Sequence, residues 1–385
     1  MRSNNTADIR IIRRIPLLAL ACLILFQPGA KAQSWTWSLE QVDDAGGDTA
    51  LAVDQDSNLH IAYYHAEGGQ LRYAFRSAGD SRWYKMVLDH SLGIFSTQIA
   101  IDSKGNPHIC YSPRAIKYAH FDGKKWSVQE IGHNEGLVSY TCSIKMGADD
   151  APHVSWYVES GVCLRYADLK DGVWRAHTLD CEGLPGKWNT LALDDKGNPH
   201  LAYIDFPAGQ LRYVAYDGKA WARTIVDAPG NAPPDMAERG FGVSMIFDPD
   251  KNPMISYYDE ESMKIARFID GKWKKELVEA LPSFGHWAWK NFRSSIVLDS
   301  KGNPHIGFES LKGLEHAWWD GKSWRTELIL KTRGDGFFDN CMVIDKDDNL
   351  YISFKDPGDG SIRLLSGRPV AGQQTAAAEK DKPKS

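Results

Sequence analysis

Aromatic, charged and amide side chains are concentrated in two long segments that interrupt the repeat pattern of the chain, and in a short neighbouring segment that contains Trp188 and Asn189. Residues 228–242 and 281–293 supply most of them. A sugar ring requires such a combination, because it has an apolar face that stacks on aromatic rings and hydroxyls that need hydrogen-bond partners. The predicted ligand-binding residues are Trp188, Asn189, Glu238, Arg239, His286, Trp287, Trp289 and Arg293.

The same residues leave two other kinds of function open. A glycan-active enzyme, either a glycosidase or a polysaccharide lyase, would use His286, Arg293 and a carboxylate such as Glu238. A glycosidase would need two carboxylates at a defined separation, and the further candidates at the tops of strands or in the loops of this face are Asp48, Glu159, Asp205, Asp259, Glu309 and Asp339. Arg114, Arg239 and Arg293 together are a candidate clamp for a ligand carboxylate. A cell-envelope scaffold that binds a protein partner is the third alternative. No catalytic residue is assigned, and whether the chain is an enzyme stays open.

A repeated phrase indicates the scaffold that must position these residues. Asp102-Ser-Lys-Gly-Asn-Pro-His108 recurs at Asp194 and Asp299, with looser copies at Asp54, Gly147, Asp248 and Asp345, so that seven copies lie about 45 to 54 residues apart. This spacing is typical of four-stranded propeller blades. The repeats predict an all-β, seven-bladed β-propeller.

Each repeat has the pattern of four strands. Around Asp102 we expect strands over 97–102, 108–112 and 116–121, followed by a hairpin and a fourth strand that begins at Trp126. A tryptophan recurs at this fourth-strand position with an apolar residue five places later, which indicates packing. The other copies of this tryptophan are Trp83, Trp174, Trp221, Trp273 and Trp324.

The seventh repeat has no fourth strand after residues 362–365, whereas residues 37–43 match the fourth-strand pattern before the first repeat. We therefore expect the N-terminal strand to complete the last blade and pair the exposed sheet edges. The expected organisation is a signal peptide over 1–32, one propeller over 33–370 and a disordered tail over 371–385.

The N-terminus predicts export. Three arginines precede an apolar run of about a dozen residues, and Ala30-Lys31-Ala32 has the small residues of a cleavage site. Arg13-Arg14 as a twin-arginine signal and Cys22 as a lipidation site are the alternatives. The run is too short to span a membrane. We expect a secreted or periplasmic monomer, cleaved near Ala32, that binds a glycan or a protein. The net charge of −5 and the lack of a basic block disfavour nucleic acid.

The cysteines predict a disulfide, whereas the acidic and histidine residues do not form the pattern of a metal site. Five cysteines follow the signal, and Cys163 and Cys181 fall on neighbouring strands, so they are the predicted disulfide; Cys142 is an alternative partner for either. Asp-x-Asp-x-Asn begins at residues 54, 248 and 345, but the distal glutamate of a calcium loop is missing. The repeated histidines lie in different blades and cannot converge on one metal. We expect no metal site and no cofactor, with calcium as the remaining option.

The repeat also carries a family resemblance. Asp-x-x-Gly-Asn-Pro-His, an aromatic residue, Leu/Ile-Arg/Lys-Tyr-Ala, Asp-Gly and Trp follow one another from Trp37 to Leu365. This order resembles bacterial propellers of the sialidase-like (BNR) and fucose-lectin-like type. The resemblance implies a propeller fold and carbohydrate binding. The repeat departs from the Ser-x-Asp-x-Gly-x-x-Trp box of sialidases, so sialidase activity is not implied.

Overall fold

The described part of the chain consists of short antiparallel strands. The computed structural model describes residues 34–370 except 66, 92, 94, 95, 114, 132–137, 206, 207, 229–241, 260, 282–292 and 332–338, and it omits the side chains of 138–140 and 187. The described residues form seven four-stranded sheets and no helix. The predicted all-β, seven-bladed fold is confirmed.

Each sheet is one blade, and the first six blades use consecutive strands. Blade 1 contains β2 (Gly47–Val53), β3 (Leu59–His65), β4 (Gln70–Arg76) and β5 (Tyr84–His90). Blade 2 contains β6 (Thr97–Ile101), β7 (Pro107–Tyr111), β8 (Lys117–Phe121) and β9 (Trp126–Glu130). Blade 3 contains β10 (Val138–Met146), β11 (Pro152–Val158), β12 (Cys163–Lys170) and β13 (Val173–Asp180). Blade 4 contains β14 (Pro185–Leu193), β15 (Pro199–Asp205), β16 (Gln210–Tyr216) and β17 (Trp221–Asp227).

The remaining blades follow the same order. Blade 5 contains β18 (Ser244–Phe247), β19 (Pro253–Tyr258), β20 (Ser262–Ile269) and β21 (Lys272–Ala280). Blade 6 contains β22 (Ser294–Leu298), β23 (Pro304–Ser310), β24 (Gly313–Trp319) and β25 (Trp324–Lys331). Blade 7 contains β26 (Cys341–Ile344), β27 (Leu350–Lys355), β28 (Ile362–Pro369) and β1 (Trp35–Asp43). The strands predicted around Asp102 lie within one residue of β6, β7 and β8, and β9 begins at Trp126 as expected.

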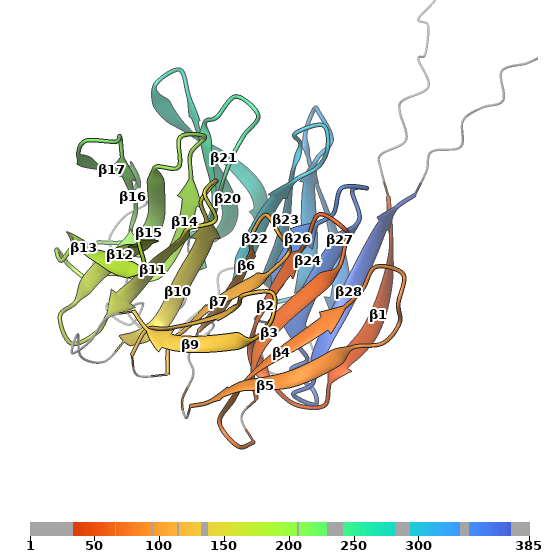
Figure 1. Ribbon diagram of the computed structural model, residues 1–385. Helices are drawn as coiled ribbons and strands as arrows, with labels where there is room; N and C mark the ends of the chain where they lie inside the picture. Colours follow the sequence, from red (N-terminus) through yellow and green to blue (C-terminus); the bar gives the residue numbers. More distant parts are fainter. Residues whose placement is uncertain are drawn as a thin grey trace, which may run out of the picture. The chain divides into compact units, whose positions relative to one another are not determined.

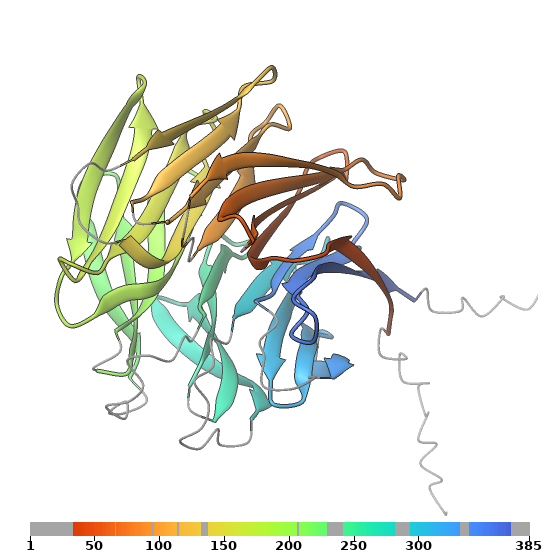
Figure 2. The same ribbon diagram turned by 90° about the horizontal axis from the view of Figure 1, so that it is seen from below.

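The ring closes with the N-terminal strand, as predicted. β1 pairs with β28 in antiparallel register, with Leu39 opposite Leu365, and Figure 1 and Figure 2 show these two strands side by side. Gly367 leaves room for the Trp37 ring, since a Cβ there would lie 2.6 Å from it. The N-terminal strand therefore covers the edge of β28 that would otherwise be exposed.

The repeated phrase forms a self-contained turn after the first strand of a blade. In blade 2, Asp102 accepts hydrogen bonds from the backbone N–H groups of Lys104 and Asn106 and from the Asn106 amide. Gly105 has a φ of +82°, which favours glycine. We call the face that carries these turns the turn end.

The histidine of the phrase links its turn to the next blade. His60 Nδ1 lies 2.7 Å from the Tyr73 hydroxyl, and the Tyr73 ring packs 5.0 Å from that of Trp126 in blade 2. The pattern repeats as His108, Tyr118 and Trp174, then as His153, Tyr166 and Trp221, and then as His200, Tyr213 and Trp273. These residues are scaffold.

A second repeated contact joins the outer strands of adjacent blades. Asp180, at the end of β13, accepts hydrogen bonds from Tyr203 (2.7 Å), Arg212 (3.1 Å) and Arg223 (2.5 Å) of blade 4. Asp43, Asp89 and Asp227 make equivalent contacts with the tyrosine of the following blade. Each carboxylate is thus a staple between two blades.

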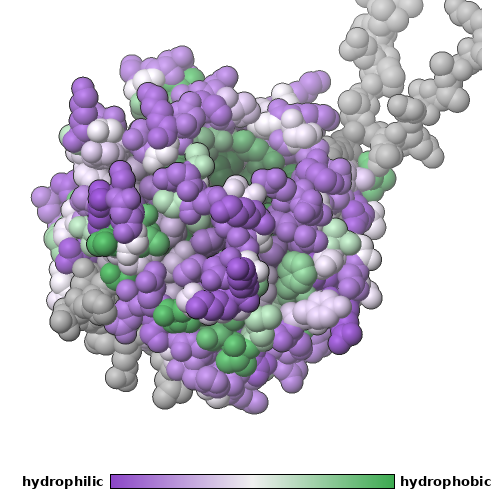
Figure 3. Space-filling model, in the orientation of Figure 1, coloured by the Kyte–Doolittle hydropathy of each residue, from purple (hydrophilic) through white to green (hydrophobic). Residues whose placement is uncertain are grey.

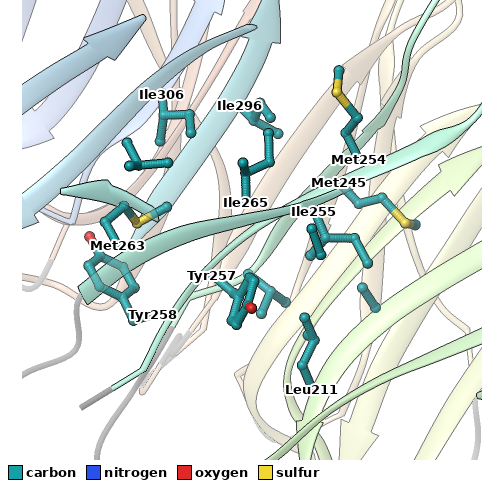
Figure 4. Packing of buried hydrophobic residues seen from close by; sticks show 14 of the residues in the cluster. Leu211, Met245, Met254, Ile255, Tyr257, Tyr258, Met263, Ile265, Ile296 and Ile306 are labelled. Atoms are coloured by element: carbon teal, nitrogen blue, oxygen red, sulfur yellow. The ribbon is translucent and has the colours of Figure 1, made fainter. Parts of the chain in front are cut away.

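The apolar core lies between neighbouring blades. Figure 4 shows Met245 and Ile265 of blade 5 beside Ile296 and Ile306 of blade 6, and all four belong to one buried cluster. Figure 3 shows a mostly hydrophilic surface around a recess with apolar walls. The described part of the chain contains no helix that is long and apolar enough to cross a membrane.

Two disulfides strengthen the middle blades. Cys163 and Cys181, the predicted pair, are bonded within blade 3. Cys142, left open above as an alternative partner, is instead bonded to Cys110 and joins blade 3 to blade 2. Cys341 keeps a free thiol.

Candidate functional site

A cavity of about 480 Å³ lies where the first strands of the blades face one another. Every one of these seven strands contributes to its wall, which makes it the central channel of the propeller. The first strands begin at the blade-linking segments and end at the turn end. We call the beginning of these strands the channel mouth.

Three of the seven first strands are irregular at the mouth. Their pairing register shifts between Gly47 and Ala50 in β2, between Val138 and Cys142 in β10, and between Pro185 and Asn189 in β14. Such bulges re-aim side chains and are frequent beside functional sites. The mouth therefore breaks the repeat in the backbone as well as in the sequence.

An arginine held between two aspartates forms the most highly charged part of the mouth. Arg293, directly before β22, is hydrogen-bonded through Nη2 to Asp48 of β2. Its Nε lies 3.6 Å from the Asp339 carboxylate, which precedes β26. Three sequence-distant segments thus meet at one guanidinium group.

Neighbouring side chains hold this arginine in place. The Asn340 amide donates to the Arg293 carbonyl (3.2 Å) and to the Glu309 carboxylate (3.0 Å). The Tyr258 hydroxyl lies 3.1 Å from the same carbonyl. Glu309, Asn340 and Tyr258 are almost completely buried, so the support of the arginine is rigid.

Both aspartates beside Arg293 have left-handed backbone conformations, with φ values of +52° at Asp48 and +43° at Asp339. Aspartate tolerates this region better than most residues, but the conformation is still unfavourable. Strain that persists outside a tight hairpin turn requires support from its surroundings, and it clusters at functional sites. The two carboxylates are held where an unstrained chain would not place them.

Burial and charge act in opposite directions at this site. Burial raises the pKa of Asp48 to about 7, with Arg293 opposing the shift and Asp339 adding to it. Although burial disfavours its charge, Asp48 and Asp339 hold the pKa of Arg293 above its usual value. A carboxyl with a pKa raised in this way has the property that a general acid or base requires near neutral pH.

The predicted ligand residues that fall in the described chain have structural partners. Trp188 lines the channel but is only 5% exposed, and it packs with Val243 and Met245 in the core. Asn189 uses both amide hydrogens, on Thr141 and on the Gly186 carbonyl, at 3.0 Å each. Trp188 and Asn189 lie at the mouth, but neither presents an open surface to a ligand.

The remaining predicted ligand residues lie outside the described part of the chain. They are Glu238, Arg239, His286, Trp287 and Trp289, together with Arg114 of the proposed carboxylate clamp. Arg293, the described member of the clamp, is already bound by two aspartates. Its positive charge is neutralised, so the mouth favours a neutral polar ligand over an anion.

One residue in the channel wall was missed in the sequence. Lys145 lies in β10 where the aligned repeats carry alanine, isoleucine or valine, two positions before the turn. The signal for Lys145 in the sequence is a lysine inside a strand, at a position that is small or apolar in the other repeats. The predicted site residues came instead from departures in the segments that link the blades.

Potential metal ligands have partners within the protein. In the described chain, one group of three residues, Asp43, Asp44 and His65, has ligand atoms within 4.8 Å of one another. Asp43 is occupied by Tyr63, Arg72 and Lys85. The turn aspartates that resemble calcium ligands, Asp54, Asp248 and Asp345, bind N–H groups of their own turns. These contacts leave the turns with no need for an ion.

Comparison with known proteins identifies the fold. No family model matches the chain, and no curated protein matches it in sequence. A fungal alcohol oxidase of the AA5 family, in complex with copper, is 9% identical and covers 88% of this chain and 76% of its own, with a TM-score of 0.57. YCF48 bound to D1 peptide is 16% identical and covers 86% and 94%, with a TM-score of 0.52.

Lectin propellers are among the neighbours too. The fucose-specific lectin from Aleuria aurantia is 14% identical and covers 74% of this chain and 96% of its own, with a TM-score of 0.48. The chain is a β-propeller. At these identities the likeness establishes the fold and nothing about the ligand.

Proposed function

We propose that this chain is an exported β-propeller that binds a carbohydrate at the mouth of its central channel. The observation that carries the proposal is the concave channel with Asp48, Arg293 and Asp339 held at its mouth. Its volume of about 480 Å³ falls in the range of small-molecule sites, about 300–1,000 Å³. A neutral polyol matches this site, because the carboxylates accept hydrogen bonds and the arginine donates them.

Protein-binding surfaces are marked by contiguous apolar patches. In the described chain, Tyr84, Met86 and Val87 are exposed together on β5 of blade 1, whereas Val173, Ile225 and Leu277 are single exposed residues on other outer strands. None of these residues lines the channel, so the concave site favours a small ligand. The predicted aromatic platform, Trp287 and Trp289, precedes Arg293 by six and four residues in the sequence.

Export is supported by the cysteine chemistry. Two disulfides, Cys110–Cys142 and Cys163–Cys181, form in the blades. Such bonds persist in oxidising compartments and are rare in the cytosol. They agree with the apolar N-terminal segment and the small residues around Ala32.

A glycan array with residues 33–385 tests this function. We expect selective binding that Asp339→Asn weakens about tenfold, since a charge-assisted hydrogen bond contributes about 1.5–3 kcal/mol. Trp287→Ala/Trp289→Ala should also weaken it. Asp171→Asn is the matched control, because Asp171 also has a positive φ, of +54°, but lies in an exposed hairpin. Absence of binding to any glycan, or equal loss in the control, would overturn the proposal.

A glycan-active enzyme is the second candidate, favoured by the Asp48 carboxyl with its pKa near 7 beside Asp339 and Arg293. An enzyme using protonated Asp48 as general acid should release reducing ends from a bound glycan at pH 6 and lose activity above pH 7 to 8. Asp48→Asn should abolish the release. Bound glycans that stay intact across this pH range would leave binding alone.

A further inference from the structure

The channel wall contains three layers of side chains, because alternate residues of a strand point to the same side. The mouth layer lies six positions before the turn, the middle layer four positions before it and the deep layer two positions before it. At the deep position the repeats carry Ala52, Ala100, Lys145, Ala192, Ile246, Val297 and Val343. Lys145, Ile246, Val297 and Val343 line the cavity itself. Six of the seven blades thus place a small or apolar residue at this depth, and blade 3 places a lysine.

Lys145 has no carboxylate partner within the described chain, where no ion pair involves it. The Lys145 side chain is exposed to the space inside the channel, whose wall it shares with Ile246, Val297 and Val343. The protein atoms that surround this space partly desolvate the amine and lower the pKa of Lys145 from its usual value. An amine in such surroundings is stabilised as a cation when an anion enters beside it.

The middle layer offers hydrogen-bond donors next to this amine. It consists of Ala50, Gln98, Ser143, Thr190, Ser244, Ser295 and Cys341. Ser143 accepts the Leu191 N–H and Ser244 accepts the Ile296 N–H, which leaves the hydrogens of both hydroxyls available. Donors therefore surround the lysine on the side that faces the mouth.

The charges along the channel separate this site from the mouth. The mouth lies four residues above Lys145, about 13 Å along a strand, and Asp48 and Asp339 balance Arg293 there. Apart from these groups, the titratable neighbour of Lys145 is the Cys341 thiol, whose pKa burial raises. The depth of the channel therefore has one cation and no anion of its own among the described residues.

We propose that the deep channel binds a small monocarboxylate, with its carboxylate on Lys145 and its polar remainder on the middle layer. One ammonium group matches one negative charge, whereas a phosphate would leave excess charge between Ile246, Val297 and Val343. The carboxylate belongs either to a simple organic acid or to an acidic sugar. Lys145 is distinct from the residues of the proposed neutral-glycan site, so the two proposals can fail separately.

Isothermal titration of residues 33–385 with acetate, lactate, galacturonate and galactose tests the site. We expect carboxylate binding that Lys145→Met weakens at least tenfold. Galacturonate that binds well above lactate and acetate identifies an acidic sugar, and similar binding of the three identifies a simple acid.

Lys322→Met is the matched control, because Lys322 lies in an exposed hairpin of blade 6. It should leave carboxylate binding unchanged. Thermal unfolding of both variants verifies that they fold, which we expect because a methionine at position 145 restores the apolar deep layer. Carboxylate binding that Lys145→Met leaves intact, or no carboxylate binding by the folded wild type, overturns the proposal. Loss of array binding in Asp339→Asn reports separately on the mouth.

Discussion

The two ends of the propeller use the same seven strands in opposite ways. At the turn end, the turn carboxylates are bound by their own turns, and four of the five repeated histidines pair with a tyrosine that packs on the next blade, as His60 does with Tyr73. His305 pairs instead with His316. At the mouth, Asp48, Arg293 and Asp339 occupy one repeat position, which carries serine, threonine, tryptophan or glycine in the other blades. The repeated residues stabilise the ring, whereas the residues that differ supply strained, buried charge. This contrast teaches that departures from the repeat mark the site.

The largest expected effect lies in the repeated scaffold. Asp180→Ala leaves Tyr203, Arg212 and Arg223 without their common partner, and Asp180 itself is 4% exposed. Breaking a buried ion pair by removing one partner costs about 3–5 kcal/mol. We expect urea unfolding to show this loss, and Asp171→Asn in the exposed hairpin, which tolerates the positive φ of +54°, to change stability by less than about 0.5 kcal/mol. Similar stabilities of the two variants would contradict a staple role.

The disulfide in blade 3 should have the next largest effect. Cys163→Ser/Cys181→Ser opens a bond with a sequence separation of 18 residues. A loop of this length corresponds to about 3 kcal/mol of stability in the chain-entropy model. Denaturant unfolding should show this loss, and glycan binding to the folded variant should be unchanged because the bond lies away from Arg293. Lost binding in a folded variant would place the site near blade 3 instead.

The pH dependence of stability should have opposite signs at the two kinds of site. Although burial opposes it, hydrogen bonds from Lys85, Tyr63 and Arg72 lower the pKa of Asp43, so its stabilisation is present above its unfolded pKa and is lost as pH falls through its folded pKa. Burial raises the folded pKa of Asp48 to about 7, well above its usual value. Its contribution is present at acid pH and is lost as pH rises through 7.

We therefore expect the wild type to lose about 2–3 kcal/mol between pH 5 and 8 through Asp48. Asp48→Asn removes the titrating group, so its stability should not show this decline. Urea unfolding at pH 5, 6, 7 and 8 measures both slopes. Parallel slopes for the wild type and the variant would show that Asp48 is ionised throughout.

The ring could be predicted well from the sequence because the signals for its turns and strands occur seven times. The Asp-to-His phrase, the fourth-strand Trp126 and its copies and the closing strand each have a local signature, and the pairing of β1 with β28 follows from the missing strand. The mouth was predicted less completely. Arg293 was named as a ligand residue and Asp48 and Asp339 as candidate carboxylates, but the contact of the three was not predicted. Asp48 and Asp339 lie 245 and 46 residues from Arg293 in the sequence, and closure of the ring brings them together. Trp188 was predicted as a ligand residue, but packing between blades 4 and 5 covers it.

The smallest expected effect tests whether departure from the repeat has a stability cost. Lys145→Ala introduces the residue that blades 1, 2 and 4 carry at this depth, as Ala52, Ala100 and Ala192. Restoring a repeat consensus commonly adds about 0.5–2 kcal/mol, and we expect a gain near 0.5–1 kcal/mol because the other blades carry a small or apolar residue at this depth. Urea unfolding measures the gain, with Lys322→Ala expected to stay within about 0.5 kcal/mol of the wild type. A destabilised Lys145→Ala protein would mean that the lysine supports the channel wall, whereas a gain means that the chain retains the lysine despite its effect on folding.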